Sequence, residues 1–163
     1  MISAAGRFVL GRMIMNRING KQGLKYLAGY YGILQLAHMF ILGRAGLILL
    51  RYGTVPFPAS PPPEGWNAAV IPFLMGMAAA DVIAASLGIY FSYSLLIRNK
   101  RKLLAGIISL TIALSSAIVY LVGTLPAGAW VHNPLSYLIV LLAFSPIIPL
   151  FLLLLRETSA KID

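Results

Sequence analysis

The stretch from Trp66 to Arg98 reads WNAAVIPFLMGMAAADVIAASLGIYFSYSLLIR and decides the fold of this chain. It is long enough to cross a bilayer as a helix, because one crossing needs about 20 consecutive, mostly apolar residues. A single acid, Asp81, stands near its middle. The stretch therefore predicts a transmembrane helix with one ionisable side chain at its centre.

The composition of the whole chain agrees with a membrane protein. Of its 163 residues 60% are hydrophobic and only 10% are charged, and the mean hydropathy is +0.87. In soluble domains roughly a quarter of the residues are charged. The chain has no cysteine, which excludes disulfides, thiolate metal sites and a cysteine nucleophile. These values indicate a single integral membrane domain.

Four apolar segments separated by short polar or proline-rich segments predict an all-α, up-down-up-down bundle of four transmembrane helices. We expect spans at about 26–50, 67–97, 103–125 and 134–155, within one membrane domain covering residues 24–155. Five prolines between Arg51 and Trp66 predict a loop between the first two spans. Pro146 and Pro149 should kink or locally unwind the fourth span. Residues 156–163 form a short polar tail.

The first 23 residues carry four basic residues and no acid. This pattern favours a basic segment next to the first span, lying at the membrane surface. A basic, acid-free targeting presequence would have a similar composition and remains an alternative.

The basic residues predict the orientation of the bundle. If both termini are cytoplasmic, 11 of the 13 Lys and Arg residues face the cytoplasm, namely Arg7, Arg12, Arg17, Lys21, Lys25, Arg98, Lys100, Arg101, Lys102, Arg156 and Lys161. This matches the excess of Lys and Arg in cytoplasmic loops of membrane proteins. Because these residues gather at the ends of spans, we expect membrane lipids as partners and no nucleic acid. The predicted location is a bacterial or archaeal plasma membrane, with an organellar inner membrane as the alternative.

Small residues recur every four positions on the second and third spans. Such rows let two helices approach closely in lipid. The two rows predict a close antiparallel hairpin, and their members are Gly76, Ala80, Ala84 and Gly88, followed by Ala105, Ser109, Ala113 and Ala117. A glycine stripe on the first span is expected to pack in the same way, at Gly29, Gly32, Gly43 and Gly46.

Three ionisable residues fall within spans: His38, Arg44 and Asp81. A charge at the bilayer centre costs about 2.5–3.5 kcal/mol on insertion scales, so each is a candidate site residue. Helical side chains lean toward the N-terminus of their own helix. On antiparallel spans this lean favours an ion pair between Arg44 and Asp81, and leaves His38 to bond Gln35, a hydroxyl or water.

Motifs for enzymatic chemistry are absent from the sequence. It contains no HExxH metal motif, no phosphate-binding glycine loop and no nucleophile elbow. His132, in the predicted loop before the fourth span, is roughly 18 Å from the level of His38 by helix rise, too far for the two to share a haem. We therefore expect no metal and no cofactor.

Three functions remain open. The first is a non-catalytic subunit or scaffold that associates with other membrane subunits or with itself. The second is a small transporter or a binding protein for lipid or an anionic ligand, using Arg44, Asp81, His38 and Gln35. The third is a membrane-embedded enzyme in which Asp81 and His38 act as acid and base. The scarcity of reactive groups favours the first function and argues against an enzyme.

Overall fold

The structure is a computed structural model that describes residues 4–53, 70–125, 129–132 and 134–160. The regular secondary structure of these residues is entirely helical. The helices are α1 (Ala4–Tyr52), α2 (Val70–Leu96), α3 (Leu103–Gly123), α4 (Ala129–His132), α5 (Pro134–Phe144) and α6 (Ile147–Ser159). Four helical stretches are long and apolar enough to cross a membrane: Gln22–Tyr52, Pro72–Leu96, Leu103–Gly123 and Pro134–Ser159. The prediction of an all-helical chain with four helices long and apolar enough to cross a membrane is confirmed for the described residues.

The first span belongs to a longer helix than the sequence suggested. Helix α1 begins at Ala4 and continues without a break to Tyr52, so residues 4–23 and the span form one helix. An interfacial position for residues 1–23 stays a prediction. The predicted proline-rich loop falls mostly on residues 54–69, which lie outside the described residues.

The fourth span is interrupted where its prolines predicted a kink. Helix α5 ends at Phe144 and α6 begins at Ile147, directly after Pro146. Pro146 has no amide hydrogen to donate to the carbonyl of Leu142, four residues earlier. The hydroxyl of Ser145 donates to that carbonyl instead, at 3.0 Å. Pro149 lies in the first turn of α6, where amides have no acceptor within the helix.

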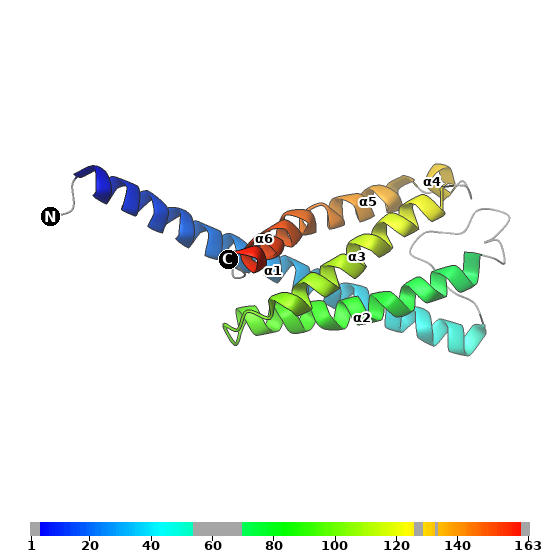
Figure 1. Cartoon of the computed structure of the whole chain (residues 1–163). Helices are drawn as coiled ribbons and strands as arrows, with labels where there is room; N and C mark the ends of the chain where they lie inside the picture. The colour runs from blue at the N-terminus through cyan, green and yellow to red at the C-terminus, as the bar shows by residue number, and fades with distance from the viewer. Residues whose placement is uncertain (1–3, 54–69, 126–128, 133, 161–163) are drawn as a thin grey trace.

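Helix α2 is the centre of the bundle, because it packs along both α1 and α3. Helix α6 packs against α1 and α3, whereas α5 packs against α3. Figure 1 shows the pair α1 and α2 spreading away from α3 and α5 toward the end where α4 lies. We call this the α4 end, and the opposite end, at the turn formed by residues 97–102, the turn end.

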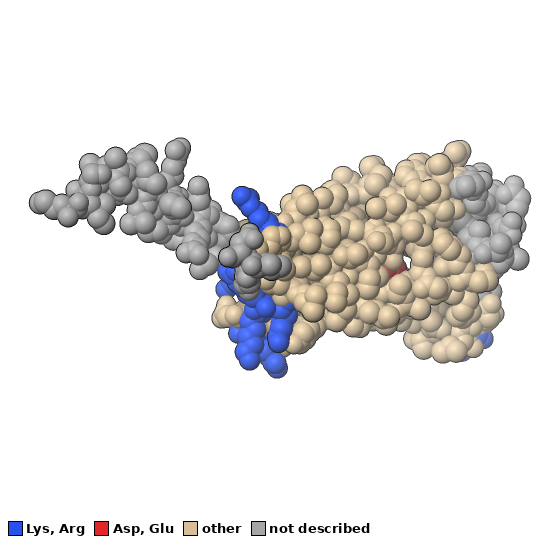
Figure 2. All heavy atoms as spheres, viewed as in Figure 1, with Lys and Arg blue, Asp and Glu red and all other residues tan. Residues whose placement is uncertain are grey.

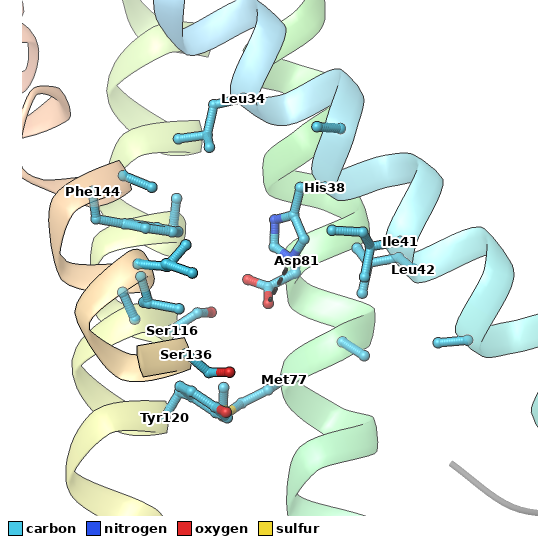
Figure 3. Close-up of a pocket in the computed structure, with 18 of the residues that line it drawn as sticks. Leu34, His38, Ile41, Leu42, Met77, Asp81, Ser116, Tyr120, Ser136 and Phe144 are labelled. Carbon is cyan, nitrogen blue, oxygen red and sulfur yellow. Dashed lines mark ion pairs between the residues drawn. The ribbon is translucent and has the colours of Figure 1, made fainter. Parts of the chain in front are cut away.

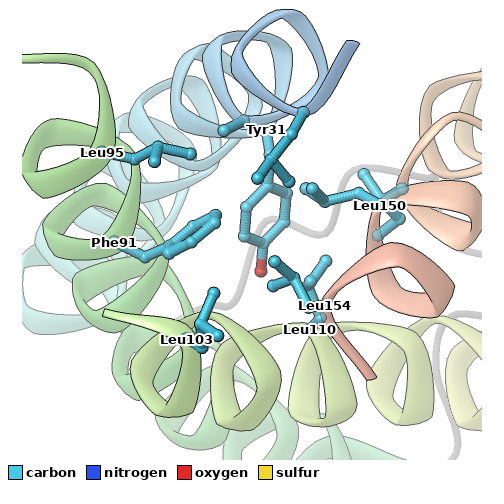
Figure 4. Close-up of a cluster of buried hydrophobic side chains, with 10 residues drawn as sticks. Tyr31, Phe91, Leu95, Leu103, Leu110, Leu150 and Leu154 are labelled. Carbon is cyan, nitrogen blue, oxygen red and sulfur yellow. The ribbon is translucent and has the colours of Figure 1, made fainter. Parts of the chain in front are cut away.

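The turn end holds the larger buried core (Figure 4). Side chains from α1, α2, α3 and α6 meet there around Tyr31 and Phe91, which are both fully buried. The other members are Leu24, Ala28, Leu95, Leu103, Leu110, Ile147, Leu150 and Leu154. The four helices are therefore held together firmly at this end.

Charged and polar side chains link the helices at the turn end. Lys25 donates a hydrogen bond to the side-chain oxygen of Asn99 at 3.0 Å, and Arg101 pairs with Glu157 at 2.6 Å. Asn99 takes the left-handed backbone conformation, with φ of 50°, that a tight turn requires. In Figure 2 the Lys and Arg side chains gather at this end of the bundle.

A second, smaller core lies toward the α4 end. It is formed by Leu74, Tyr120 and Tyr137. The ring of Tyr137 stacks between those of Tyr120 and Trp130, with centroid distances of 5.5 Å and 4.6 Å. The indole nitrogen of Trp130 donates to the carbonyl of Leu121 at 2.9 Å. This stack joins α3 to α4 and α5.

Candidate functional site

A cavity of about 390 Å³ lies among α1, α2, α3 and α5 in the part of the bundle where the helices spread. Its wall is mostly apolar, with side chains such as Leu34, Met77 and Phe144 (Figure 3). The polar side chains that line it are His38, Asp81, Ser116, Tyr120 and Ser136. Binding sites for small molecules have this character: a concave apolar space of about 300–1,000 Å³ with a few polar groups.

Asp81 and His38 face each other inside this cavity (Figure 3). Nε2 of His38 lies 3.8 Å from Oδ2 of Asp81. The side chains are 28% and 12% exposed, respectively. Ser116, on α3, lines the cavity beside the same carboxylate (Figure 3). The acid is thus held by α1 and α3 on either side of its own helix.

The sequence predicts that Arg44 pairs with Asp81, but in the structure the basic side chain that faces Asp81 is His38. Arg44 is exposed and does not line the cavity. Six residues separate Arg44 from His38, which at 3.6 residues per turn places them roughly 120° apart around the helix. The direction in which each side chain leaves α1 decides the pairing, and this outweighs the lean along the helix axis.

A regular stripe on α1 explains why His38 turns inward. Residues alternating four and three apart face the other helices, and they are Leu24, Ala28, Tyr31, Gln35, His38, Leu42 and Ala45. The first four are buried and the last three half-buried. Residues at this spacing form the contact line between two packed helices, whether the helices are parallel or antiparallel. It was present in the sequence, and it is the signal that could have selected His38 over Arg44.

Below the cavity, toward the turn end, three helices share a buried hydrogen-bond network. Ser109 on α3 donates its hydroxyl proton to the carbonyl of Ala84 on α2, at 2.5 Å. The hydroxyl of Tyr31 lies 2.6 Å from the Ser109 oxygen. Because the Ser109 proton is already engaged, Tyr31 is the donor in that second bond.

Gln35 lies next to this network, one helical turn from His38. Its side chain is 1% exposed and is placed beside the Tyr31 hydroxyl. Neither its amide nitrogen nor its amide oxygen makes a hydrogen bond of good geometry with a described residue. Gln35 does not line the cavity, so the structure separates it from the other site candidates.

The rows of small residues are used unevenly. At Gly88 a Cβ atom would lie within 2.9 Å of Tyr31, Gln35 and Ser109, so α1, α2 and α3 meet most closely there. Ala84 and Ala113 are also buried, whereas Ala80, Ala105 and Ala117 are half-buried. Gly76, Gly43 and Gly46 have open space where a Cβ would be. The close hairpin of α2 and α3 therefore exists around Gly88 and opens toward the α4 end.

Two features of the site were not anticipated from the sequence. One is Ser116, which lies on the cavity wall beside Asp81. The other is the aromatic stack, whose member Tyr120 lines the cavity at its α4 end. Stacking between residues on separate helices has no local sequence signal, because it depends on how the helices are arranged.

The arrangement defines what the site can do chemically. Within the described residues, no three His, Cys, Asp or Glu side chains gather as ligands for a metal ion. One carboxylate, one imidazole and several hydroxyls face an apolar space, which suits hydrogen bonding or ion pairing with a bound molecule. Comparison with known proteins finds no matching protein family, no similar curated protein and no similar solved structure.

Proposed function

We propose that this chain is a membrane protein that binds a small amphipathic molecule within its four-helix bundle, as a small transporter or an intramembrane binding protein. The observation that carries this proposal is the cavity of about 390 Å³ with the Asp81 and His38 pair on its wall. An acid placed in the hydrocarbon region for packing alone would be expected in a filled core. Here it borders an empty space large enough for a ligand.

The position of the opening supports a ligand that enters from the membrane. Figure 2 shows a small opening on the flank of the bundle with acidic atoms at its base. The surface around it in this view carries no other charged side chain. A molecule that dissolves in lipid could reach the cavity through this opening without crossing the polar ends of the protein.

Adjacent alanines on α2 offer a matched test. Ala78 lines the cavity, whereas Ala79 is exposed on the neighbouring face of the same helix. We expect Ala78→Phe to fill the cavity and to reduce ligand binding at least tenfold, while Ala79→Phe leaves binding unchanged. Binding is measured by saturation-transfer NMR on purified protein in nanodiscs, with empty nanodiscs as the blank.

Three probes serve as ligands in this test because they share a benzyl group and differ in charge. They are benzyltrimethylammonium, its uncharged isostere neopentylbenzene, and benzylsulfonate. Saturable binding of at least one probe, lost in Ala78→Phe only, supports the proposal. If no probe binds above the nanodisc blank, or if both variants bind equally, the cavity is not a binding site.

A subunit or scaffold role is the second candidate, and the uncovered glycines of α1 favour it. Gly43 and Gly46 have no atom within 4 Å of the position of an added Cβ. Glycines that leave such space on a spanning helix allow close packing by another helix. A second copy of the chain or another membrane protein would fit there.

We further propose that both termini lie in the cytoplasm of a bacterial or archaeal cell. The Lys and Arg residues at the turn end, including Lys100 and Lys102, support this orientation because positive loops tend to stay on the cytoplasmic side. In this orientation the cavity lies in the half of the membrane away from the cytoplasm.

A further inference from the structure

We propose that the cavity takes up a lipophilic monocation in exchange for a proton on His38, with Asp81 as the counter-ion in both states. The inference rests on the proposed binding function and names the ligand class. It follows from the charges that line the cavity, from the geometry of the Asp81 and His38 pair, and from the cost of net charge in hydrocarbon.

The first step is the sign of the ligand. Among the residues that line the cavity there is one acid and no Lys or Arg. Arg44, the nearest basic residue on α1 that could have favoured an anion, is exposed on another face. An anionic ligand would therefore meet the Asp81 carboxylate without a Lys or Arg on the cavity wall to compensate its charge, whereas a cation would be neutralised by that carboxylate.

The second step is the place that the cation would occupy. The 3.8 Å between Nε2 of His38 and Oδ2 of Asp81 is longer than a hydrogen bond. Ser116 lies near the carboxylate on the α3 side of the cavity (Figure 3). The remaining accessible side of the carboxylate faces the cavity and His38 (Figure 3). A ligand cation bound there would lie where the imidazolium otherwise neutralises the acid.

The third step is the exchange. With His38 protonated and Asp81 ionised, the pair is neutral. With a monocation bound and His38 deprotonated, the site is again neutral, and the proton has left the imidazole for water. If both cations were present the site would carry one uncompensated positive charge, which is costly in the membrane interior. Each cation that binds while His38 is protonated therefore releases about one proton.

Histidine is suited to this exchange because its side chain ordinarily titrates between pH 5 and 8. The other titratable groups that face the cavity are Asp81 on α2 and Tyr120 on α3, and the lining residues of α5 include none. A phenol stays neutral over this pH range. His38 is thus the group on the cavity wall that can give up a proton to make room for a cation.

The test uses benzyltrimethylammonium because its charge does not depend on pH. Its dissociation constant is measured by isothermal titration calorimetry on the full chain in nanodiscs, between about pH 5 and about pH 8. We expect the dissociation constant to rise as the medium becomes more acidic, approaching tenfold per pH unit at the acidic end, since one proton competes with one ligand. At the acidic end of this range, titrations in two buffers with different ionisation enthalpies count the released protons, and about one per ligand is expected there.

Two variants test the roles of His38 as the group that releases the proton and of Asp81 as the counter-ion. His38→Gln should flatten the pH dependence while the cation still binds. Asp81→Asn should weaken binding of benzyltrimethylammonium at least tenfold and leave binding of neopentylbenzene within about twofold. If Asp81→Asn does not fold, the proton count and the pH profile of the unmodified chain decide the question by themselves.

The results separate this inference from the function on which it rests. If neopentylbenzene or benzylsulfonate binds in the cavity as tightly as the cation, the protein is a binding protein but the charge class is wrong. If the cation binds with no proton release, or if His38→Gln keeps the full pH dependence, exchange at His38 is wrong. If no probe binds, the binding function itself fails.

Discussion

Asp81 is 9% exposed and lies in a part of the bundle where an unpaired charge would be expensive. Its neighbours show how the chain limits this cost. A hydroxyl from α3 and an imidazole from α1 reach the carboxylate, although neither partner is close in sequence. The side chains that limit the cost of this buried charge also form the polar part of the proposed binding site.

Gly88 is the residue at which packing is tightest. An added Cβ would lie 2.8 Å from the Ser109 hydroxyl and 2.9 Å from atoms of Gln35 and Tyr31. We expect Gly88→Ala to destabilise the protein by about 1–3 kcal/mol, as overpacking does in tightly packed interiors. The measurement is reversible unfolding in mixed micelles, followed by circular dichroism.

Gly76 on the same helix is the control, because its added Cβ would meet nothing within 4 Å. Gly76→Ala should leave stability unchanged or raise it by up to about 1 kcal/mol, since alanine is the better helix former. Equal losses in the two variants would contradict the close approach of the three helices at Gly88.

Single residues also show what could not be read from the sequence. The sequence shows an ionisable group at Asp81 and at His38, and it predicts both as candidate site residues. It does not predict that they face each other, because the lean of a side chain along the helix axis does not give its direction around the helix. The seam from Leu24 to Ala45 supplies that direction and points His38, not Arg44, at the other helices.

At the scale of the helix, hydropathy and proline positions predict most of the helical arrangement. Four long apolar segments fixed the number of spanning helices, and Pro146 marked the interruption of the fourth. The spreading of α1 and α2 from α3 and α5 could not be predicted in this way. The spreading depends on which part of each row of small residues packs against another helix. In the row from Gly76 to Gly88 the spacing is uniform in sequence, yet only Gly88 has close neighbours and Gly76 has none.

Helix α1 provides the test of association. If the same helix of a second copy packs on Gly43 and Gly46, replacing both by leucine should prevent the close approach. The dissociation constant of the homo-oligomer should then rise at least tenfold. Native mass spectrometry from nanodiscs measures the distribution of oligomers. Leu36→Ile, at an exposed position of the same helix, is the control. A chain that is monomeric before substitution would argue against self-association.

At the scale of the whole molecule, charge is distributed along the bundle axis. Basic side chains gather at the turn end, and the flanks in this view are nearly free of charged side chains (Figure 2). Since an excess of Lys and Arg favours the cytoplasmic side, this asymmetry predicts one orientation of the four helices. The cavity and the aromatic stack then lie toward the opposite side.

The chain has no cysteine, so single cysteines report orientation without background. We expect Tyr52→Cys, at the end of α1, to react with a membrane-impermeant maleimide in intact bacterial cells. Lys100→Cys, in the exposed α2–α3 turn, should react only after the cells are permeabilised. The reverse pattern would place both termini outside the cytoplasm.

The interruption at Pro146 has a mechanical consequence for the whole molecule. A kink in lipid would normally leave a carbonyl without a donor, which is costly where no water is available. The Ser145 hydroxyl supplies the missing donor to Leu142, so the joint carries little penalty at that carbonyl. Helix α6 stays in the tightly packed core between α1 and α3, while α5 follows α3 beside the cavity. A change in the tilt of α5 would therefore widen or narrow the cavity while α6 keeps its place as an anchor.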